Sequence, residues 1–312
     1  MSPSIDELIR RGLSGKPKRL PAALLYDDLG SALFEAITLL PEYQVARVDT
    51  ALLSAHAGEA LARVGGPVEL LELGPGHGKK ARIVLERVLK TQQRARFHAV
   101  DVSAAALAGC GRAVDDLAGV DFSPIEGTFL EGLKRAPARQ SGHRRLVLFL
   151  GSNLSNFDRV EAQQFITAIH DALRPGDALL ISADLEKDER LLLPAYDDAL
   201  GVTAAFQLNV LVRLNREYGA SFEPAGFAHE ARWNAPARRI EMHLRALKPM
   251  WVEVRELKLE LELEHDETLW TESSHRFNVP ELQGWAREAG FGTQHVWVAD
   301  AWPLALNLFT IT

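Results

Sequence analysis

Apolar and polar residues follow two alternating patterns between residues 68 and 185. Short apolar runs, too brief and too unbroken for helices, are typical of strands that are buried on both faces. They occur at residues 68–74, 96–102, 120–127, 144–152 and 177–185. Segments with helical periodicity lie between some of these runs, at residues 79–92, 103–118 and 159–176. The alternation predicts an α/β fold in which helices cover both faces of a parallel sheet.

The pattern changes after residue 185. A helix-like segment at 191–219 precedes two long runs with β character, at 238–265 and 267–277. Within the first run, residues 258–265 alternate Leu with charged residues, which predicts a strand with one solvent-exposed face. The strand and helix pattern then returns, with a helix at 279–291 and strands at 293–300 and 305–312.

This interruption predicts an insertion at residues 186–275, placed between the fifth strand and the last helix. The first 60 or so residues precede the sheet, and we expect them to pack with the insertion. The expected domains are therefore residues 1–60 plus 186–275, and residues 61–185 plus 276–312.

Composition narrows the function. The chain has 312 residues and needs neither a disulfide nor a structural metal to stabilise a core. Its single cysteine, Cys110, excludes an internal disulfide and a Cys-based zinc cluster. The net charge of -7 argues against a nucleic-acid partner. The sequence has neither a secretory signal nor an apolar run long enough for a membrane span. We expect a soluble, cytoplasmic monomer without a metal, acting on a small molecule.

A glycine-rich turn follows the first strand of the sheet. Gly74, Gly76 and Gly78 lie where this strand leads into a helix, and Asp101 ends the second strand. In open α/β sheets a ligand binds at this edge, and a carboxylate on the second strand binds a ribose diol. The alternatives are a tight turn without a ligand and an Asp101 that only caps the helix after it.

The motif itself distinguishes between ligands. It lacks the Gly-Lys-Ser/Thr ending of a P-loop, and its E-x-G-x-G-x-G spacing, led by Glu72, differs from the dinucleotide fingerprint. It is similar to the first motif of S-adenosylmethionine-dependent methyltransferases.

Longer blocks carry a closer resemblance. "LLYDDLGSALFEAITLLPEYQVARVDTALL" (24–53), "FLGSNLSNF", "AYDDALGVTAAFQLNVL", "RWNAPARRIEMHLRA" and "TESSHRF" occur in this order. They resemble the histidine-specific Nα-methyltransferases that form hercynine, the precursor of ergothioneine. The resemblance runs from about residue 20 to the end of the chain. It implies a Rossmann-like class I methyltransferase domain and a second, substrate-binding domain formed by the N-terminal segment and the insertion.

The resemblance also implies roles for individual residues. The cofactor, S-adenosylmethionine, is expected to contact Tyr26, Gly74, Gly76, Lys80, Asp101, Thr128 and Phe129. The amino-acid substrate is expected to contact Phe34, Tyr43, Gly151, Asn156, Tyr196, Met242, Glu272 and Ser274. Thr128 stands where the family usually has an acidic residue, and Glu126 is the alternative acceptor for the adenine amino group.

Physical chemistry supports the imidazole part of this site. Glu272 and Ser274 are two residues apart, so on a strand they lie on one face and can serve both imidazole nitrogens. The amine is expected to react without a strong general base. In this scheme Asn156 orients it, while Tyr26 and Tyr43 or water relay the proton.

Several simpler interpretations remain open at this stage. Asn156 can be a helix N-cap, Tyr196 a core-edge aromatic, Met242 an ordinary core residue and Glu272 a surface charge on an edge strand. Another amino acid, such as a tryptophan derivative, and a non-catalytic S-adenosylmethionine-binding module are the alternative functions.

Overall fold

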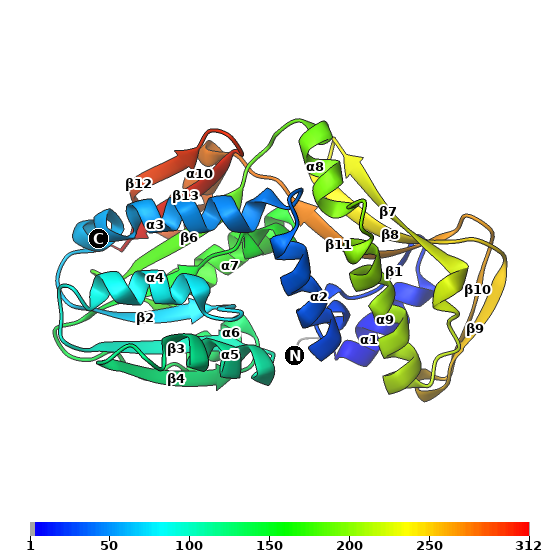
Figure 1. The fold of residues 1–312 in the computed structure, drawn as a ribbon, viewed down its shortest axis with the longest axis horizontal. Helices are drawn as coiled ribbons and strands as arrows, with labels where there is room; N and C mark the ends of the chain where they lie inside the picture. Colours follow the sequence, from blue (N-terminus) through cyan, green and yellow to red (C-terminus); the bar gives the residue numbers. More distant parts are fainter. Residues whose placement is uncertain (1–3, 312) are drawn as a thin grey trace. The chain divides into compact units, whose positions relative to one another are not determined.

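The computed structural model describes residues 4–311, which form two compact units (Figure 1). Unit 1 combines the chain up to Gln44 with Lys187–His275. Unit 2 combines Val45–Glu186 with the chain from Arg276 onward. Thr312, the end of the last expected strand, lies outside the described residues.

A seven-stranded sheet with the order β12-β13-β6-β5-β2-β3-β4 forms the centre of unit 2. Its strands are β2 (Val68–Leu73), β3 (Ala95–Asp101), β4 (Val120–Glu126), β5 (Arg144–Phe149), β6 (Ala178–Asp184), β12 (Gly292–Ala299) and β13 (Leu304–Thr310). The five strands predicted for residues 68–185 are confirmed and pair in parallel. Every residue of β2 and β6 is buried, as their unbroken apolar sequences predict.

The last strand departs from the parallel pattern. β13 pairs antiparallel with both β6 and β12. Only residues 300–303 separate β12 from β13. A connection this short cannot make the crossover that parallel neighbours require, so the two strands form a hairpin.

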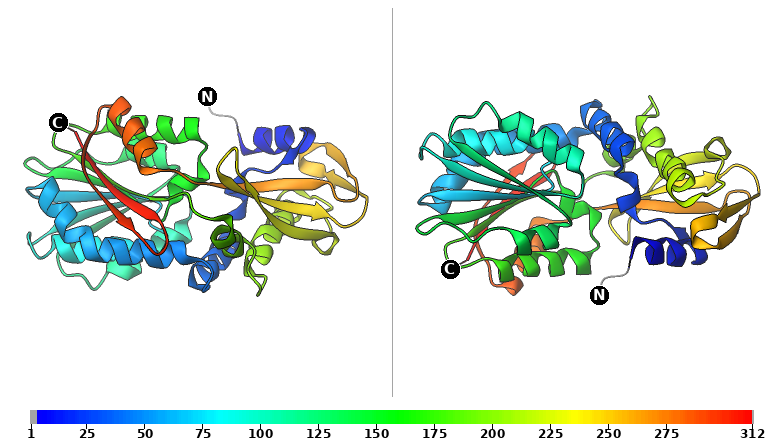
Figure 2. Two further views of the ribbon diagram at one scale, coloured as in Figure 1. Left: turned by 90° about the horizontal axis from the view of Figure 1, so that it is seen from above. Right: turned by 90° about the horizontal axis from the view of Figure 1, so that it is seen from below.

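Helices cover both faces of this sheet (Figure 2). They are α3 (Gln44–Val64), α4 (Lys79–Val88), α5 (Ala104–Val114), α6 (Phe129–Arg135), α7 (Arg159–Ala172) and α10 (Val279–Ala289), with the 3-10 turn η2 (Asn153–Asn156). Side chains of α6, α7 and α10 share one buried cluster with β2, β5 and β6. Ser103 caps α5, and α10 ends at Gly290 with φ 105°. The short helix α6 was not predicted.

Unit 1 contains a four-stranded sheet, β1-β11-β8-β7, and a two-stranded ribbon, β10-β9. Its strands are β1 (Lys18–Arg19), β7 (Phe227–Asn234), β8 (Arg239–Ala246), β9 (Met250–Val254), β10 (Leu259–Leu263) and β11 (Thr268–His275). Its helices are α1 (Ile5–Ser14), α2 (Asp28–Leu39), α8 (Glu189–Tyr196) and α9 (Val202–Tyr218), with 3-10 turns η1 (Ala22–Leu25), η3 (Pro224–Gly226) and η4 (Arg255–Leu257).

Two details of unit 1 differ from the expectation. Strand β7 was not predicted, and the helix expected at 191–219 is divided into α8 and α9. The division occurs because Gly201 has φ 74° and the side chain of Asp198 accepts hydrogen bonds from the backbone N–H groups of Val202 and Thr203. The alternation of β10 is confirmed, with Leu261 and Leu263 buried and the glutamates between leucines exposed.

The boundaries of the two units refine the expected division. The inserted segment Lys187–His275 begins one residue from the expected position, but the first boundary lies after Gln44 instead of near residue 60. The reason is α3, whose residues belong to unit 2. Its Glu59 accepts a hydrogen bond from Trp297 Nε1 at 2.9 Å, and His56 stacks on the same indole.

Candidate active site

The glycine turn of unit 2 follows β2 at the point where the strand order reverses. The chain proceeds from β2 through β3 to β4 on one side, whereas β5 and β6 lie on the other. Loops that leave β2 and β5 therefore emerge side by side at the carboxyl edge, which is the ligand-binding position of such sheets.

Each glycine of the turn has a positive φ, namely 74° for Gly74, 52° for Gly76 and 75° for Gly78. A Cβ on Gly74 would lie 2.8 Å from Asn153 Nδ2, and one on Gly78 would lie 2.9 Å from Cys110 Cα. A Cβ on Gly76 would meet no atom within 4 Å. Gly74 and Gly78 are thus required by packing, while the backbone of Gly76 borders open space that a ligand can enter.

Asp101 supports this turn from the end of β3. Its carboxylate accepts a hydrogen bond from the backbone N–H of Ser103 at 3.0 Å, and also from those of Gly76 and Val102. Burial raises the pKa of Asp101 despite these bonds. The cap of α5 is Ser103, so the alternative in which Asp101 only caps this helix is wrong. Asp101 links the second strand to the glycine turn.

Glu72 lies within β2, directly before the turn. Its side chain is fully buried, and neither carboxylate oxygen has a hydrogen-bond partner among the described residues. Burial raises the pKa of Glu72 to about 7, while nearby Lys80 acts in the opposite direction and Asp49 adds to the increase. A buried carboxyl of this kind is suited to a cationic group that arrives with a ligand.

Asp49 was not predicted as part of the site. It lies on α3, is fully buried, and accepts hydrogen bonds from Lys80 Nζ at 3.1 Å and from the backbone N–H of Gly151 at 2.7 Å. Gly151 has φ 87°, and a Cβ there would lie 2.6 Å from Lys80 Nζ. The ammonium group of Lys80 therefore occupies the space that a side chain at residue 151 would need. The other buried residues of α3 are apolar, but the sequence alone does not show that Asp49 is buried with them.

Asn156 ends η2, shortly after β5, and its side chain is exposed. The N-cap of α7 is Asp158, whose side chain forms a capping box with Glu161. The interpretation of Asn156 as the helix cap is therefore wrong, and its amide is available for another partner.

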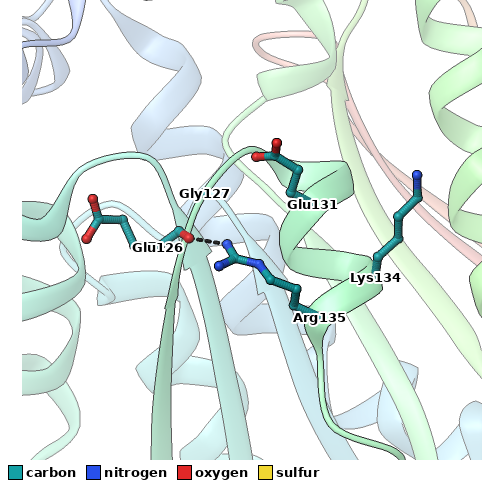
Figure 3. A pocket seen from close by; sticks show the side chains of 5 residues that line it. All are labelled: Glu126, Gly127, Glu131, Lys134 and Arg135. Carbon is teal, nitrogen blue, oxygen red and sulfur yellow. Dashed lines mark hydrogen bonds between the residues drawn. The ribbon is translucent and has the colours of Figure 1, made fainter. Parts of the chain in front are cut away.

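An open pocket of about 480 Å³ lies where β4 leads into α6 (Figure 3). Glu126, Gly127, Glu131, Lys134 and Arg135 line it. The Thr128 hydroxyl donates to Glu131 Oε2 at 2.8 Å, and Thr128 also caps α6. Thr128, which stands where an acidic residue was expected, is thus hydrogen-bonded to the carboxylate of Glu131. The sequence did not indicate this role of Glu131.

Phe129 has a packing role within unit 2. Its ring contacts those of Phe149 and Phe165, with centroids 5.3 and 6.0 Å apart. Its edge also lies 3.2 Å from the place where a Gly74 Cβ would be. Phe129 therefore connects the glycine turn to the buried cluster of α7.

Unit 1 contains a second group of predicted site residues, centred on Glu272. Strand β1 pairs only with Leu269 and Trp270 of β11, so at Glu272 this strand is paired with β8 alone. Each carboxylate oxygen of Glu272 nevertheless accepts a hydrogen bond from within unit 1, so the alternative of a surface charge is wrong. Tyr26 donates its hydroxyl to Glu272 Oε1 at 3.1 Å, and Gln207 Nε2 donates to Oε2 at 3.1 Å. Burial raises the pKa of Glu272 to about 7, although both hydrogen bonds oppose the increase.

The neighbouring residue of the predicted pair, Ser274, is buried and lies 2.9 Å from the hydroxyl of Tyr196. Glu272 pairs with Met242 across the sheet and Ser274 with Ile240, in uninterrupted register. The two side chains therefore lie on one face of β11, as predicted. Tyr196 is bonded to a predicted site residue, which distinguishes it from an ordinary core aromatic.

Aromatic rings surround this pair. Tyr43 contacts Tyr196 with centroids 6.1 Å apart, Phe34 contacts Tyr43 at 6.3 Å, and Tyr26 contacts Phe34 at 5.7 Å. Tyr26 was expected from the sequence to contact the cofactor, but in the structure its hydroxyl is hydrogen-bonded to Glu272. Met242 is buried opposite Glu272 on β8. Unit 1 thus brings together all of its predicted site residues.

Within residues 4–311, no group of three or more His, Cys, Asp or Glu side chains is arranged to hold a metal ion. No helix in the same range is both long and apolar enough to cross a membrane.

The sheet order of unit 2 and the glycine turn after β2 define a class I methyltransferase fold. Residues 5–310 match the sequence model of a family described as "Histidine-specific methyltransferase, SAM-dependent", and the chain belongs to this family.

Relatives of known name extend over nearly the whole chain. The "Histidine N-alpha-methyltransferase" of Mycolicibacterium smegmatis is 39% identical over 301 residues, which cover 96% of this chain and 92% of that protein. The protein of the same name from Mycobacterium tuberculosis is 38% identical over 298 residues, which cover 95% of this chain and 92% of that protein. The solved structure of the PH0226 protein from Pyrococcus horikoshii covers 89% of this chain and 99% of that one. Its TM-score is 0.50 at 12% identity, a likeness of fold alone.

Proposed function

We propose that this protein transfers methyl groups from S-adenosylmethionine to the α-amine of L-histidine, up to the trimethylated product hercynine. The observation that carries this proposal is the carboxylate and hydroxyl pair of Glu272 and Ser274. Both lie on one face of β11, each bonded to a tyrosine hydroxyl. Family membership and two histidine Nα-methyltransferase relatives support the same reaction.

In this proposal unit 2 binds the methyl donor. Gly74 and Gly76 present bare backbone, Asp101 receives the ribose diol, and Thr128 and Phe129 contact the adenine, with Glu131 adding a carboxylate beside Thr128. The open space at Gly76 fits a ligand that carries a cation, as does the carboxyl of Glu72, which has no hydrogen bond within residues 4–311. When bound, S-adenosylmethionine supplies an electrophilic methyl group.

Unit 1 binds the imidazole. A neutral imidazole has one N–H donor and one acceptor nitrogen. Glu272 accepts the N–H, and the hydroxyl of Ser274 donates to the other nitrogen. A substrate without these groups would lose both hydrogen bonds to the pair, so the site favours imidazole over side chains that cannot form them. Met242 and Phe34 form apolar walls beside this pair.

In unit 2, the side chain of Asn156 and the backbone at Gly151 orient the α-amine. In unit 1, Tyr196 and Tyr43 contribute hydroxyl groups for the substrate. The amine must be unprotonated to react, and burial favours this state because it disfavours the charged form. No strong general base is then required, and Tyr26, Tyr43 or water can relay the released proton to solvent. Most of the rate enhancement comes from positioning.

Repeated methylation produces a fixed cation that has no N–H left to donate. The aromatic faces of Phe34, Tyr43 and Tyr196 suit such a cation, because their π electrons attract positive charge. We further propose a cytoplasmic monomer that acts on free amino acid and uses no metal, nucleic acid or membrane.

The decisive experiment incubates purified protein with S-adenosylmethionine and a panel of amino acids, followed by mass spectrometry. Mass increases of one to three methyl groups on histidine are expected. Methylation of a tryptophan derivative but not histidine would reverse the assignment, and cofactor binding without any product would indicate a binding module.

Two variants test the assignment of the two units. Glu272→Ala is expected to raise the KM for histidine by about a hundredfold, because a buried hydrogen-bonding partner is lost, with near-normal cofactor affinity. Asp101→Ala should instead weaken the binding of S-adenosylmethionine and leave the KM for histidine near normal. Wild-type behaviour of both variants would place the site elsewhere.

A further inference from the structure

We propose that Gln207 and Thr271 are positioning residues that hold Glu272 ready to accept the substrate N–H, and so contribute to specificity for imidazole. This inference rests on the proposed function, because it assigns Glu272 to the substrate. It concerns two side chains that were not among the predicted site residues.

The geometry is a short chain of buried hydrogen bonds. Gln207 lies on α9 with 1% of its surface exposed, and Thr271 on β11 is equally buried. Thr271 Oγ1 donates to Gln207 Oε1 at 2.6 Å, and Gln207 Nε2 donates to Glu272 Oε2 at 3.1 Å. The amide of Gln207 thus connects two consecutive residues of one strand.

Consecutive residues of a regular strand face opposite sides of the sheet and cannot share a partner. Here the pairing shifts between Trp270 and Glu272. Trp270 pairs with His243 and Glu272 with Met242, so Thr271 has no opposite residue. An extra residue of this kind redirects side chains. The irregularity in β11 is what allows both Thr271 and Glu272 to reach Gln207.

Thr271 also decides which end of the amide meets Glu272. Its hydroxyl has a single hydrogen and two acceptors within reach, Gln207 Oε1 at 2.6 Å and the backbone oxygen of Met242 at 3.0 Å. Donation to the nearer acceptor keeps the amide oxygen toward Thr271 and the NH₂ group toward Glu272. In the flipped amide, an oxygen would face the carboxylate, and only a protonated Glu272 tolerates that arrangement.

Only neutral donors hold this carboxylate within residues 4–311. They are Tyr26, directly after η1, and Gln207 from α9. Tyr43 and Tyr196 are the other ionisable groups close to Tyr26. Hydrogen bonds to the charged form lower a carboxyl pKa, whereas burial raises it. Removal of the Gln207 bond therefore favours protonated Glu272, which can no longer accept the imidazole N–H.

The test compares Thr271→Val and Gln207→Met, which preserve size, with Thr271→Ser, which retains the hydroxyl. The first two are expected to raise the KM for histidine by about tenfold, with kcat changed much less and unchanged affinity for S-adenosylhomocysteine. The pH below which KM rises should increase by roughly one unit. Thr271→Ser should behave like wild type, as should the control Thr167→Val on α7. An unchanged KM and pH profile, or a parallel loss of S-adenosylhomocysteine affinity, would overturn the inference.

A second measurement does not depend on histidine turnover. The titration of Glu272 is followed by NMR in protein labelled with ¹³C at the glutamate carboxyl, with Glu272→Gln to assign the signal. A higher pKa in Thr271→Val and Gln207→Met, but not in Thr271→Ser, supports the inference, and an unchanged titration contradicts it. If the wild type does not methylate histidine, the proposed function fails, and this titration alone decides the role of Gln207 and Thr271.

Discussion

Asp49 accepts a hydrogen bond from the backbone N–H of Gly151 at 2.7 Å, although 102 residues separate them in the chain. The same oxygen, Oδ2, also receives Lys80 Nζ. One carboxylate from α3 thereby connects the start of α4 to the loop after β5, so it joins the two edges of the expected cofactor position.

Asp49→Asn removes the charge but keeps an oxygen for Gly151. Lys80 loses its counter-charge in a largely buried place, so unfolding should require about 3 kcal/mol less, and S-adenosylhomocysteine should bind about tenfold more weakly. Denaturant titration and calorimetry measure the two effects. Asp116→Asn, which breaks the exposed pair with Arg82, is the control and should leave both quantities nearly unchanged. Equal effects of the two substitutions would contradict a special role for Asp49.

Gly151→Ala tests the space beside Lys80. The new Cβ would lie 2.6 Å from Nζ at a φ of 87°, so we expect a loss of about 1–3 kcal/mol in stability together with weaker histidine binding. Gly142→Ala is the matched control, because φ is 79° there and no atom lies within 4 Å of the new Cβ. Backbone strain alone would affect both variants equally, and only displacement of Lys80 makes Gly151→Ala the more harmful.

Glu72 is expected to make stability depend on pH. Its folded pKa of about 7 exceeds the ordinary 4.5, so the folded state binds the extra proton. This contribution to stability is complete below pH 4.5 and is lost as pH rises through 7. Glu72→Gln removes the titration, so its stability relative to wild type should improve by about 2–3 kcal/mol between pH 5 and pH 8. Urea unfolding at several pH values measures this, with Glu288→Gln on the exposed side of α10 for comparison. A constant difference between Glu72→Gln and wild type would show that Glu72 does not titrate in this range.

The hydrogen bond between Tyr196 and Ser274 predicts coupling between their substitutions. Tyr196→Phe and Ser274→Ala should each raise the KM for histidine several-fold. The free-energy change of the double variant should be smaller than the sum of the two single changes, because each substitution breaks the same hydrogen bond. Steady-state kinetics of the four proteins complete the cycle. Strict additivity would indicate that the two hydroxyls act on the substrate separately.

The sequence predicted those parts of the fold that local pattern determines. Strands β2 and β6 are buried on both faces, so their sequences are apolar throughout, whereas β10 is buried on one face, so Leu alternates with Glu. These patterns identified the three strands. Strand β7 has no such pattern, since most of its residues are only partly buried. The boundary after Gln44 was also missed, because the helical pattern of α3 does not reveal which unit it packs against.

The candidate site divides in the same way. Gly74, Asp101 and the Glu272–Ser274 pair lie in short motifs whose spacing has a direct geometric meaning. Asp49 bonds to Gly151 and Gln207 to Glu272, each more than 60 positions away in the chain. A polar residue within a helical segment does not indicate which distant residue it will contact. The effect of Thr271 depends on a pairing irregularity, which only the register of β8 and β11 reveals.

The interleaving of the two units has a consequence for synthesis on the ribosome. Strand β1 pairs with β11, and β6 with β13, so neither sheet is complete until late residues have been translated. Translation adds about 5–20 residues per second, so β11 is synthesised roughly 10–50 s after β1. During that time the apolar sides of α1 and α2 also lack the residues of β11. The nascent chain therefore lacks these strand partners for that interval, and no single cut in the gene would yield a half that contains either sheet in full.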